Sequence, residues 1–89
     1  MTDFAGRMGA LRERFVASAA GEADTLAEAG ASGRWSEVRA IAHGLAGRAG
    51  MFGFPEVGAA ALALEEGIEA GADPRGPLSA LIAMLRALT

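Results

Sequence analysis

The chain contains a single histidine, His43, and the residues around it would leave its side chain open to solvent. If residues 35–52 form an α-helix, each residue is rotated by about 100° from the one before. The apolar residues of this segment then share one face, and His43 points roughly 140° away from the centre of that face. Arg39 lies one turn before His43 and Gly47 one turn after it. The sequence therefore predicts an exposed imidazole with an open approach and a guanidinium one turn away.

Several kinds of chemistry use an exposed imidazole, although many lone surface histidines do none. A hydrolase triad needs a nucleophile and an orienting carboxylate, but Ser36 lies two turns away on the same solvated face. A metal site needs several converging ligands, and we expect Glu65, Glu66 and Glu69 to form the solvated face of their own helix instead. A haem ligand would have to point inward. Neutral imidazole is a good nucleophile near pH 7, so it can accept a phosphoryl group when a partner supplies the phosphate and Mg²⁺.

Glycines recur every third residue through this segment, at Gly44, Gly47, Gly50 and Gly53. A glycine in the middle of a helix destabilises it by roughly 0.5–1 kcal/mol relative to alanine. Because a three-residue step drifts around the helix, the four glycines cannot all pack against one neighbouring helix. Access to the imidazole is the alternative reason for Gly47.

The composition predicts an all-α protein. The chain has 89 residues, of which 22 are alanine and 13 glycine, and it has no tyrosine and few β-branched residues. Glycine- and proline-rich breaks near 30–33, 53–55 and 71–77 leave four segments with helical periodicity, at about 3–30, 35–52, 55–70 and 74–88. Glycines weaken the first segment, whose N-terminal turns could fray or form a separate short helix.

Short connections between four helices favour an antiparallel up-down-up-down bundle in a single domain, residues 1–89. The residues expected to fill its core share the inner faces of the four segments: Phe15, Leu26, Trp35, Val38, Leu45, Phe52, Leu64, Leu81 and Leu85.

Charge and residue usage exclude several functions. The chain has no cysteine, which excludes disulfides and thiolate zinc sites. It has no lysine, so a Walker-type phosphate loop is excluded. A net charge of −3 argues against nucleic-acid binding. With no long apolar run and no signal-peptide pattern at the start, we expect a cytoplasmic protein without a membrane segment. The solvated polar faces of the predicted helices fit a monomer.

Residues 42–55 read Ala-His-Gly-Leu-Ala-Gly-Arg-Ala-Gly-Met-Phe-Gly-Phe-Pro. This stretch resembles the motif of histidine-containing phosphotransfer (Hpt) domains. That motif runs Ala-His-x-Leu-Lys-Gly-x-Ala and is followed by Phe-Gly and by a helix that ends near Leu-Glu. Leu64 and Glu65 fall where that Leu-Glu would be. Gly33 and Trp35 also fit the start of the family's second helix, so the resemblance covers nearly the whole chain.

The resemblance implies an antiparallel four-helix bundle with His43 as the phosphoacceptor, midway along the second helix. It implies response-regulator receiver domains as partners, together with a hybrid histidine kinase. Family members shuttle phosphate between receiver aspartates and do not bind ATP. We therefore expect a phosphocarrier with no cofactor of its own, the Mg²⁺ being supplied by the partner receiver domain. Arg39, Ala46, Gly47 and Gly50 are the positions expected to support the phosphate or to give access to it.

One position departs from the family motif. The family's lysine three residues after the histidine is Ala46 in this chain. That lysine supports the phosphoryl group electrostatically, so its loss could slow transfer or leave the role to Arg39. The alternative function is a non-catalytic module that docks a receiver or kinase and regulates it without being phosphorylated.

Overall fold

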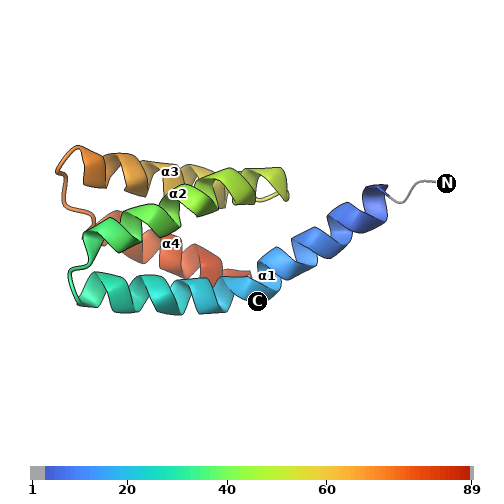
Figure 1. Ribbon diagram of the computed structural model, residues 1–89, viewed down its shortest axis with the longest axis horizontal. Helices are drawn as coiled ribbons and strands as arrows, with labels where there is room; N and C mark the ends of the chain where they lie inside the picture. The colour runs from blue at the N-terminus through green and yellow to red at the C-terminus, as the bar shows by residue number, and fades with distance from the viewer. Residues whose placement is uncertain (1–3, 89) are drawn as a thin grey trace.

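The structure, a computed structural model, describes residues 4–88 and contains four helices in that range, with no strand (Figure 1). They are α1 (Phe4–Ala31), α2 (Trp35–Met51), α3 (Pro55–Glu69) and α4 (Arg75–Ala87). The predicted all-α class is confirmed, and the predicted segments agree with these helices to within a residue at each end. Residue 3, the predicted start of the first segment, lies outside the described residues.

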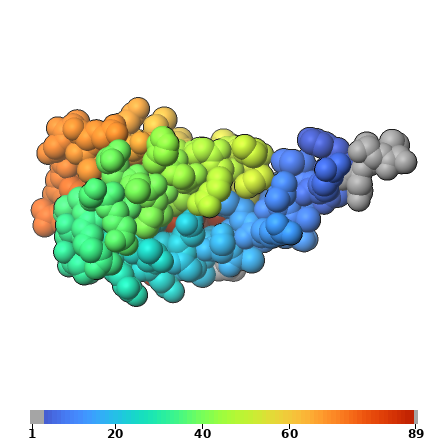
Figure 2. Space-filling view, in the orientation of Figure 1, coloured from blue at the N-terminus to red at the C-terminus, as the bar shows by residue number. Residues whose placement is uncertain are grey.

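α1 is one continuous helix that extends beyond the others. Its 28 residues correspond to about 42 Å, whereas the 17 residues of α2 correspond to about 26 Å. The molecule accordingly measures 49 × 21 × 17 Å. Figures 1 and 2 show the N-terminal part of α1 projecting from one end of the molecule. We call residues 4–14 the α1 overhang, because all of them are exposed except the half-buried Met8, and the first buried residue of α1 is Phe15.

A side-chain hydrogen bond accompanies the change of direction in α1. Figure 1 shows α1 bending where it leaves the other helices. The Ser18 hydroxyl donates a hydrogen bond of 3.0 Å to the carbonyl oxygen of Phe15 in this part of the helix. A hydroxyl that bonds back to the preceding turn competes with the helical ladder and bends a helix. The overhang therefore leaves the bundle at an angle but remains helical.

The first three helices are each followed by a left-handed glycine, Gly33, Gly53 or Gly71, that lets the chain reverse. Gly33 follows α1 with φ 71°. This backbone conformation is strained for a residue with a Cβ atom but not for glycine. The Gly33 amide donates to the Gly30 carbonyl and the Arg34 amide to the Ala29 carbonyl, which is the Schellman pattern. The same pair of bonds closes α2 at Gly53 and Phe54. These caps keep the connections short.

An aspartate holds the start of α4. The Asp73 carboxylate accepts hydrogen bonds from the guanidinium of Arg75 and from its backbone amide. These bonds, the side-chain one first, lower the pKa of Asp73 to about 2. Asp73 therefore stays ionised, and keeps its contact with α4, through mildly acidic pH.

The core lies between the inner faces of the four helices. Seven of the nine predicted core residues are buried. The prediction was wrong for Trp35 and Phe52, which are half-buried, because Trp35 begins α2 and Phe52 caps it, where the bundle no longer surrounds a side chain. Small side chains fill much of the remaining core, and the buried hydrophobic residues are Phe15, Ala19, Ala23, Leu26, Ala29, Val38, Ala42, Leu45, Ala49, Val57, Ala61, Leu64, Leu78, Leu81 and Leu85.

α2 and α3 form the most extensive helix pair, and a glycine lets their backbones approach. A Cβ atom on the buried Gly58 of α3 would lie 3.3 Å from the Gly50 nitrogen and 3.4 Å from the Ala46 carbonyl oxygen of α2. Both neighbours are backbone atoms, which cannot rotate away. The spacing of α2 and α3 therefore depends on the missing side chain of Gly58.

We expect Gly58→Ala to destabilise the protein by about 1 kcal/mol. Overpacking costs roughly 1–3 kcal/mol, and the gain in helix propensity returns up to about 1 kcal/mol of it. Urea unfolding followed by circular dichroism measures the change. Gly21→Ala is the matched control, because a Cβ atom there meets nothing within 4 Å, and it should stabilise by roughly 0.5–1 kcal/mol. Equal stabilisation by both substitutions would contradict close helix contact at Gly58.

Candidate functional site: an exposed histidine on a buried glutamate

His43 lies midway along α2 with its side chain 75% exposed. The buried residues of this helix, Val38, Ala42, Leu45 and Ala49, occupy the opposite face. The prediction that His43 is exposed is confirmed, and it follows from the helical bearing of the apolar residues. The imidazole is therefore open to a macromolecular partner.

The Nδ1 atom of His43 lies 2.7 Å from the Oε2 atom of Glu65 on α3. The Glu65 side chain is only 10% exposed, so a nearly buried carboxylate anchors an exposed ring. The expectation that Glu65 belongs to the solvated face of α3 was wrong. The close approach of α2 and α3 brings this edge of α3 beneath the imidazole. Of the three glutamates, only Glu66 and Glu69 are exposed.

This contact determines which ring nitrogen faces the solvent. A carboxylate oxygen accepts hydrogen bonds, so this contact favours the tautomer in which Nδ1 carries the hydrogen and donates it to Glu65. The Nε2 atom then keeps its lone pair, which is the nucleophilic form. A carboxylate in this place also stabilises the positive charge that develops on the ring when Nε2 forms a bond. Glu65 is a positioning residue in this arrangement.

A second pair between α2 and α3 lies one turn away. The Nη1 atom of Arg39 is 3.3 Å from the Oε2 atom of Glu69. Arg39 precedes His43 by four residues and Glu69 follows Glu65 by four, so the two pairs repeat along the seam between the helices. Both members of the Arg39–Glu69 pair are about half exposed. Arg39 is thus near the site but is engaged by a carboxylate.

The glycines of α2 leave the face around His43 bare. A Cβ atom added at Gly44, Gly47 or Gly50 would meet nothing within 4 Å. None of these three therefore needs to be glycine to fit against another helix. Gly47, one turn after His43, keeps the space beyond the imidazole open. Gly50 also leaves open space on the outer side of α2, while its backbone faces Gly58 of α3.

Ala46, the position of the family's lysine, is half-buried and packs against the core. Its methyl group provides no charge near His43. Arg48, the next basic residue along α2, forms a 2.9 Å ion pair with Glu22 of α1. Arg48 is thereby committed to the seam between α1 and α2.

The described residues around His43 do not form a hydrolase triad or a metal site. Ser36 is exposed, but it lies seven residues before His43, about 10 Å along the helix axis. The His43–Glu65 pair therefore lacks the adjacent hydroxyl of a hydrolase triad. Within residues 4–88, no cluster of three or more histidine and carboxylate side chains could hold a metal ion. No helix in the same range is long and apolar enough to cross a membrane.

Residues 4–88 thus form four helices without a strand and present one oriented imidazole to solvent, as a helical phosphotransfer module requires. Comparison with protein families bears this out: the family model of the Hpt domain matches residues 10–89, so the chain belongs to the Hpt domain family. Its general role is therefore phosphotransfer in two-component signalling, where Hpt domains interact with receiver domains and kinases. Comparisons with curated proteins and with solved structures find no match.

Proposed function

We propose that His43 is the phosphoacceptor of a phosphorelay, taking a phosphoryl group from a receiver-domain aspartate and passing it to a second receiver. The observation that carries the proposal is the exposed imidazole whose Nδ1 atom is held by the buried Glu65. A hybrid histidine kinase is the other kind of donor. The chain needs no cofactor of its own, because the receiver supplies Mg²⁺ and most of the charge neutralisation.

In the transfer step, the Nε2 lone pair of His43 attacks phosphorus in line with the bond to the aspartyl oxygen. The N–P bond forms, the O–P bond breaks, and the aspartate leaves as a carboxylate. The ring becomes positively charged, and the nearby Glu65 carboxylate balances that charge while the Nδ1 hydrogen stays between them. The return step to a second receiver reverses these bonds.

We also infer that the described helices form the antiparallel up-down-up-down bundle of one domain. In Figure 1 the α1–α2 and α3–α4 connections lie at one end of the molecule, and the α2–α3 connection lies at the other. α2 packs on α3 and α1 packs on α4. This arrangement places His43 and Glu65 at the same level of neighbouring helices.

A receiver charged with acetyl phosphate and Mg²⁺ tests the proposal. After incubation, the chain should carry label that is stable to alkali and labile to acid, as expected of phosphohistidine. ATP and Mg²⁺ without a kinase should give no label. Stable binding to the receiver without any label would favour a non-catalytic docking module. The absence of a cation at Ala46 is the feature of this chain that supports such a module.

Glu65→Ala should slow phosphoryl transfer on the order of tenfold. A hydrogen bond to a charged group is worth about 1.5–3 kcal/mol, and about 1.4 kcal/mol corresponds to a factor of ten. Nitrogen-15 shifts of the imidazole provide a readout that a loss of packing would not change. We expect a protonated Nδ1 in the wild type and a mixture of tautomers in Glu65→Ala. Glu65→Gln is the conservative variant, since its amide oxygen can still accept the Nδ1 hydrogen and should restore part of the rate. An unchanged tautomer in Glu65→Ala would refute the positioning role.

Ala46→Lys should lengthen the lifetime of phosphohistidine by roughly two- to fivefold, because an exposed charge pair contributes about 0.3–1 kcal/mol. The half-buried position allows this, since a lysine can lay its stem along apolar surface and keep its ammonium in water. Arg39→Ala should shorten the lifetime if Arg39 leaves Glu69 for the phosphoryl group. The loss of label from the phosphorylated chain over time measures the phosphohistidine lifetime in both variants. No change in either variant would mean that the receiver supplies the positive charge.

A further inference from the structure

The α1 overhang has no role in the proposed phosphotransfer site. It lies at the end of the molecule that carries the α2–α3 loop (Figure 1), and His43 is about 13 Å from Phe52 along α2. The Hpt family match begins at residue 10, so residues 4–9 lie outside it. A helix this short is marginal on its own in water. The overhang therefore requires an explanation that the family fold does not supply.

The overhang carries an apolar stripe that continues the core-facing side of α1. Phe4, Met8 and Leu11 precede the buried Phe15 at helical spacing. Phe4 is 66% and Leu11 37% exposed. Leu11 borders a shallow hollow that Phe15 and Phe52 also line, and the half-buried Met8 is not among the residues packed on the core. The apolar side of α1 that faces the core thus continues past the bundle, and it is most exposed at Phe4, its outermost residue.

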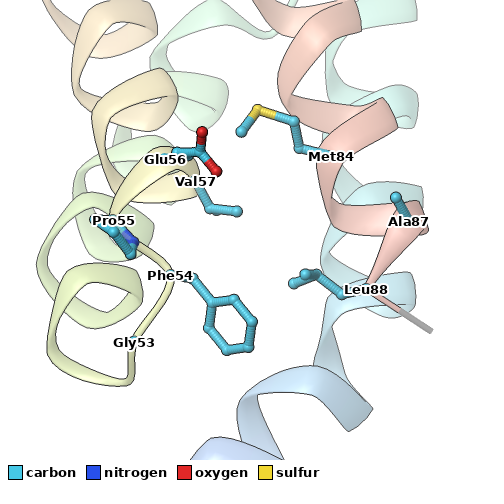
Figure 3. Close-up of a pocket in the computed structure, with 8 residues that line it drawn as sticks. All are labelled: Gly53, Phe54, Pro55, Glu56, Val57, Met84, Ala87 and Leu88. Carbon is cyan, nitrogen blue, oxygen red and sulfur yellow. The ribbon is translucent and has the colours of Figure 1, made fainter.

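An apolar groove opens at the same end of the molecule. It has a volume of about 260 Å³ and lies between the start of α3 and the end of α4. Figure 3 shows Phe54, Val57 and Leu88 directed toward one another across it, with Met84 above them and Glu56 beside Val57. We call this the bundle-end groove; Gly53, Pro55 and Ala87 complete its lining.

The apolar stripe of the same chain is not among the residues that line this groove, although Arg12 of the overhang borders it at Phe54. α1 contacts the α2–α3 loop at Phe54. Phe15 stacks on Phe54 with ring centroids 5.3 Å apart, and the Arg12 guanidinium lies 4.6 Å from the centre of the Phe54 ring. From there α1 leads away from the bundle (Figure 1). The groove and the stripe are therefore both open in the isolated chain.

The charges of the two parts are opposite. The overhang contains three arginines and one glutamate, for a net charge of +2. Residues 15–89 contain five arginines against nine carboxylates, for a net charge of −4. Arg7 belongs to the overhang and Glu56 to the groove. Two overhangs laid against each other would instead bring arginines together, so the complement of the overhang is the acidic body of this same protein.

In place of the monomer expected from the sequence, we propose that the chain forms a symmetric dimer in which the overhang of each copy lies in the bundle-end groove of the other. The stripe of Phe4, Met8 and Leu11 packs on the groove, and Arg7 approaches Glu56 of the second copy. A two-fold axis makes the contact reciprocal, so that both stripes and both grooves are covered at once. The face around His43 stays free, and the proposal does not depend on the phosphotransfer function.

Analytical ultracentrifugation of the whole chain, from low micromolar to submillimolar concentration, tests the dimer. We expect a species of twice the 9.0 kDa chain mass. Met8→Glu on the overhang and Ala87→Glu in the groove should each give a monomer where the wild type is dimeric, because each places an unpaired charge in the apolar contact. Leu62→Glu is the control: Leu62 is another exposed apolar residue, on the face of α3 outside the groove, and its replacement should leave the dimer intact.

Mixing the two variants identifies the partners in the contact. A dimer of Met8→Glu with Ala87→Glu retains one intact overhang and one intact groove that face each other, so the mixture should recover dimer that neither variant forms alone. Arg7→Glu and Glu56→Arg should each weaken the dimer, and the double variant should restore it. A monomeric wild type, a dimer that Ala87→Glu leaves unchanged, or a mixture that stays monomeric would overturn the proposal.

Discussion

His43→Gln is expected to abolish labelling of the chain by a phosphorylated receiver, the largest effect predicted for any substitution. The amide of glutamine cannot act as the nucleophile, and no second histidine exists to replace it. The stability should change by less than about 0.5 kcal/mol, as for most exposed positions, because the side chain is 75% exposed and the glutamine amide can still donate a hydrogen bond to the Glu65 carboxylate. Transfer from a radiolabelled receiver and urea unfolding measure the two quantities.

The stability measurement is the control for this experiment. If the variant folds as the wild type does and still accepts label, the phosphoryl group goes to another residue and the assignment of His43 is wrong. If the variant binds the receiver without label, loss of chemistry is separated from loss of docking.

Gly47→Gln should make the protein more stable and its phosphotransfer much slower. A helix former in place of a mid-helix glycine should stabilise by roughly 0.5–1 kcal/mol, since the position opens onto free space. A side chain at this position leans back toward the preceding turn of the helix, where His43 lies. It would obstruct in-line approach, and a misplacement of about 1 Å can cost on the order of 100-fold in rate.

Gly21→Gln provides the matched control, because Gly21 is exposed on α1 with equally free space around it. It should give the same gain in stability with an unchanged transfer rate. Wild-type transfer in a stabilised Gly47→Gln would show that the glycine is not needed for access.

The exposed half of the site could be predicted from the sequence, whereas the buried half was missed. The bearing of His43 and Gly47 is a property of a single helix, and helical periodicity determines it. Glu65 depends on how far α3 lies from α2 and at which level, which no local pattern specifies. A signal was nonetheless present: Glu65 follows Ala61 by four residues and precedes Ile68 by three, so it lies within the apolar stripe of its helix. A carboxylate in such a stripe needs a partner, and the neighbouring helix supplies His43.

The fold could be predicted for a similar reason, whereas the prediction of buried residues was wrong at the ends of helices. Glycine and proline mark the turns, so the four helices and most of the core follow from periodicity. Trp35 and Phe52 share the apolar character of the core but lie where α2 begins and ends, and only the packed structure shows that they are half-buried. The overhang could not be predicted from the sequence, because Phe4, Met8 and Leu11 continue the periodic apolar pattern of the core residues. Only the structure shows that this part of α1 lies beyond the other helices.

The bare glycine face beside His43 has a consequence for the thermodynamics of docking. Each long side chain that is immobilised at a protein interface costs about 0.5–1.5 kcal/mol of conformational entropy. Gly44, Gly47 and Gly50 have no rotamers to lose, and the ring of His43 is already held by Glu65. A receiver that binds this face therefore orders little of the chain, while the same glycines contribute few contacts that would prolong the complex. Such binding costs little conformational entropy and gains few contacts, which favours short-lived complexes. In the relay proposed above, short-lived complexes would let the carrier leave its donor and reach its acceptor before the phosphohistidine hydrolyses.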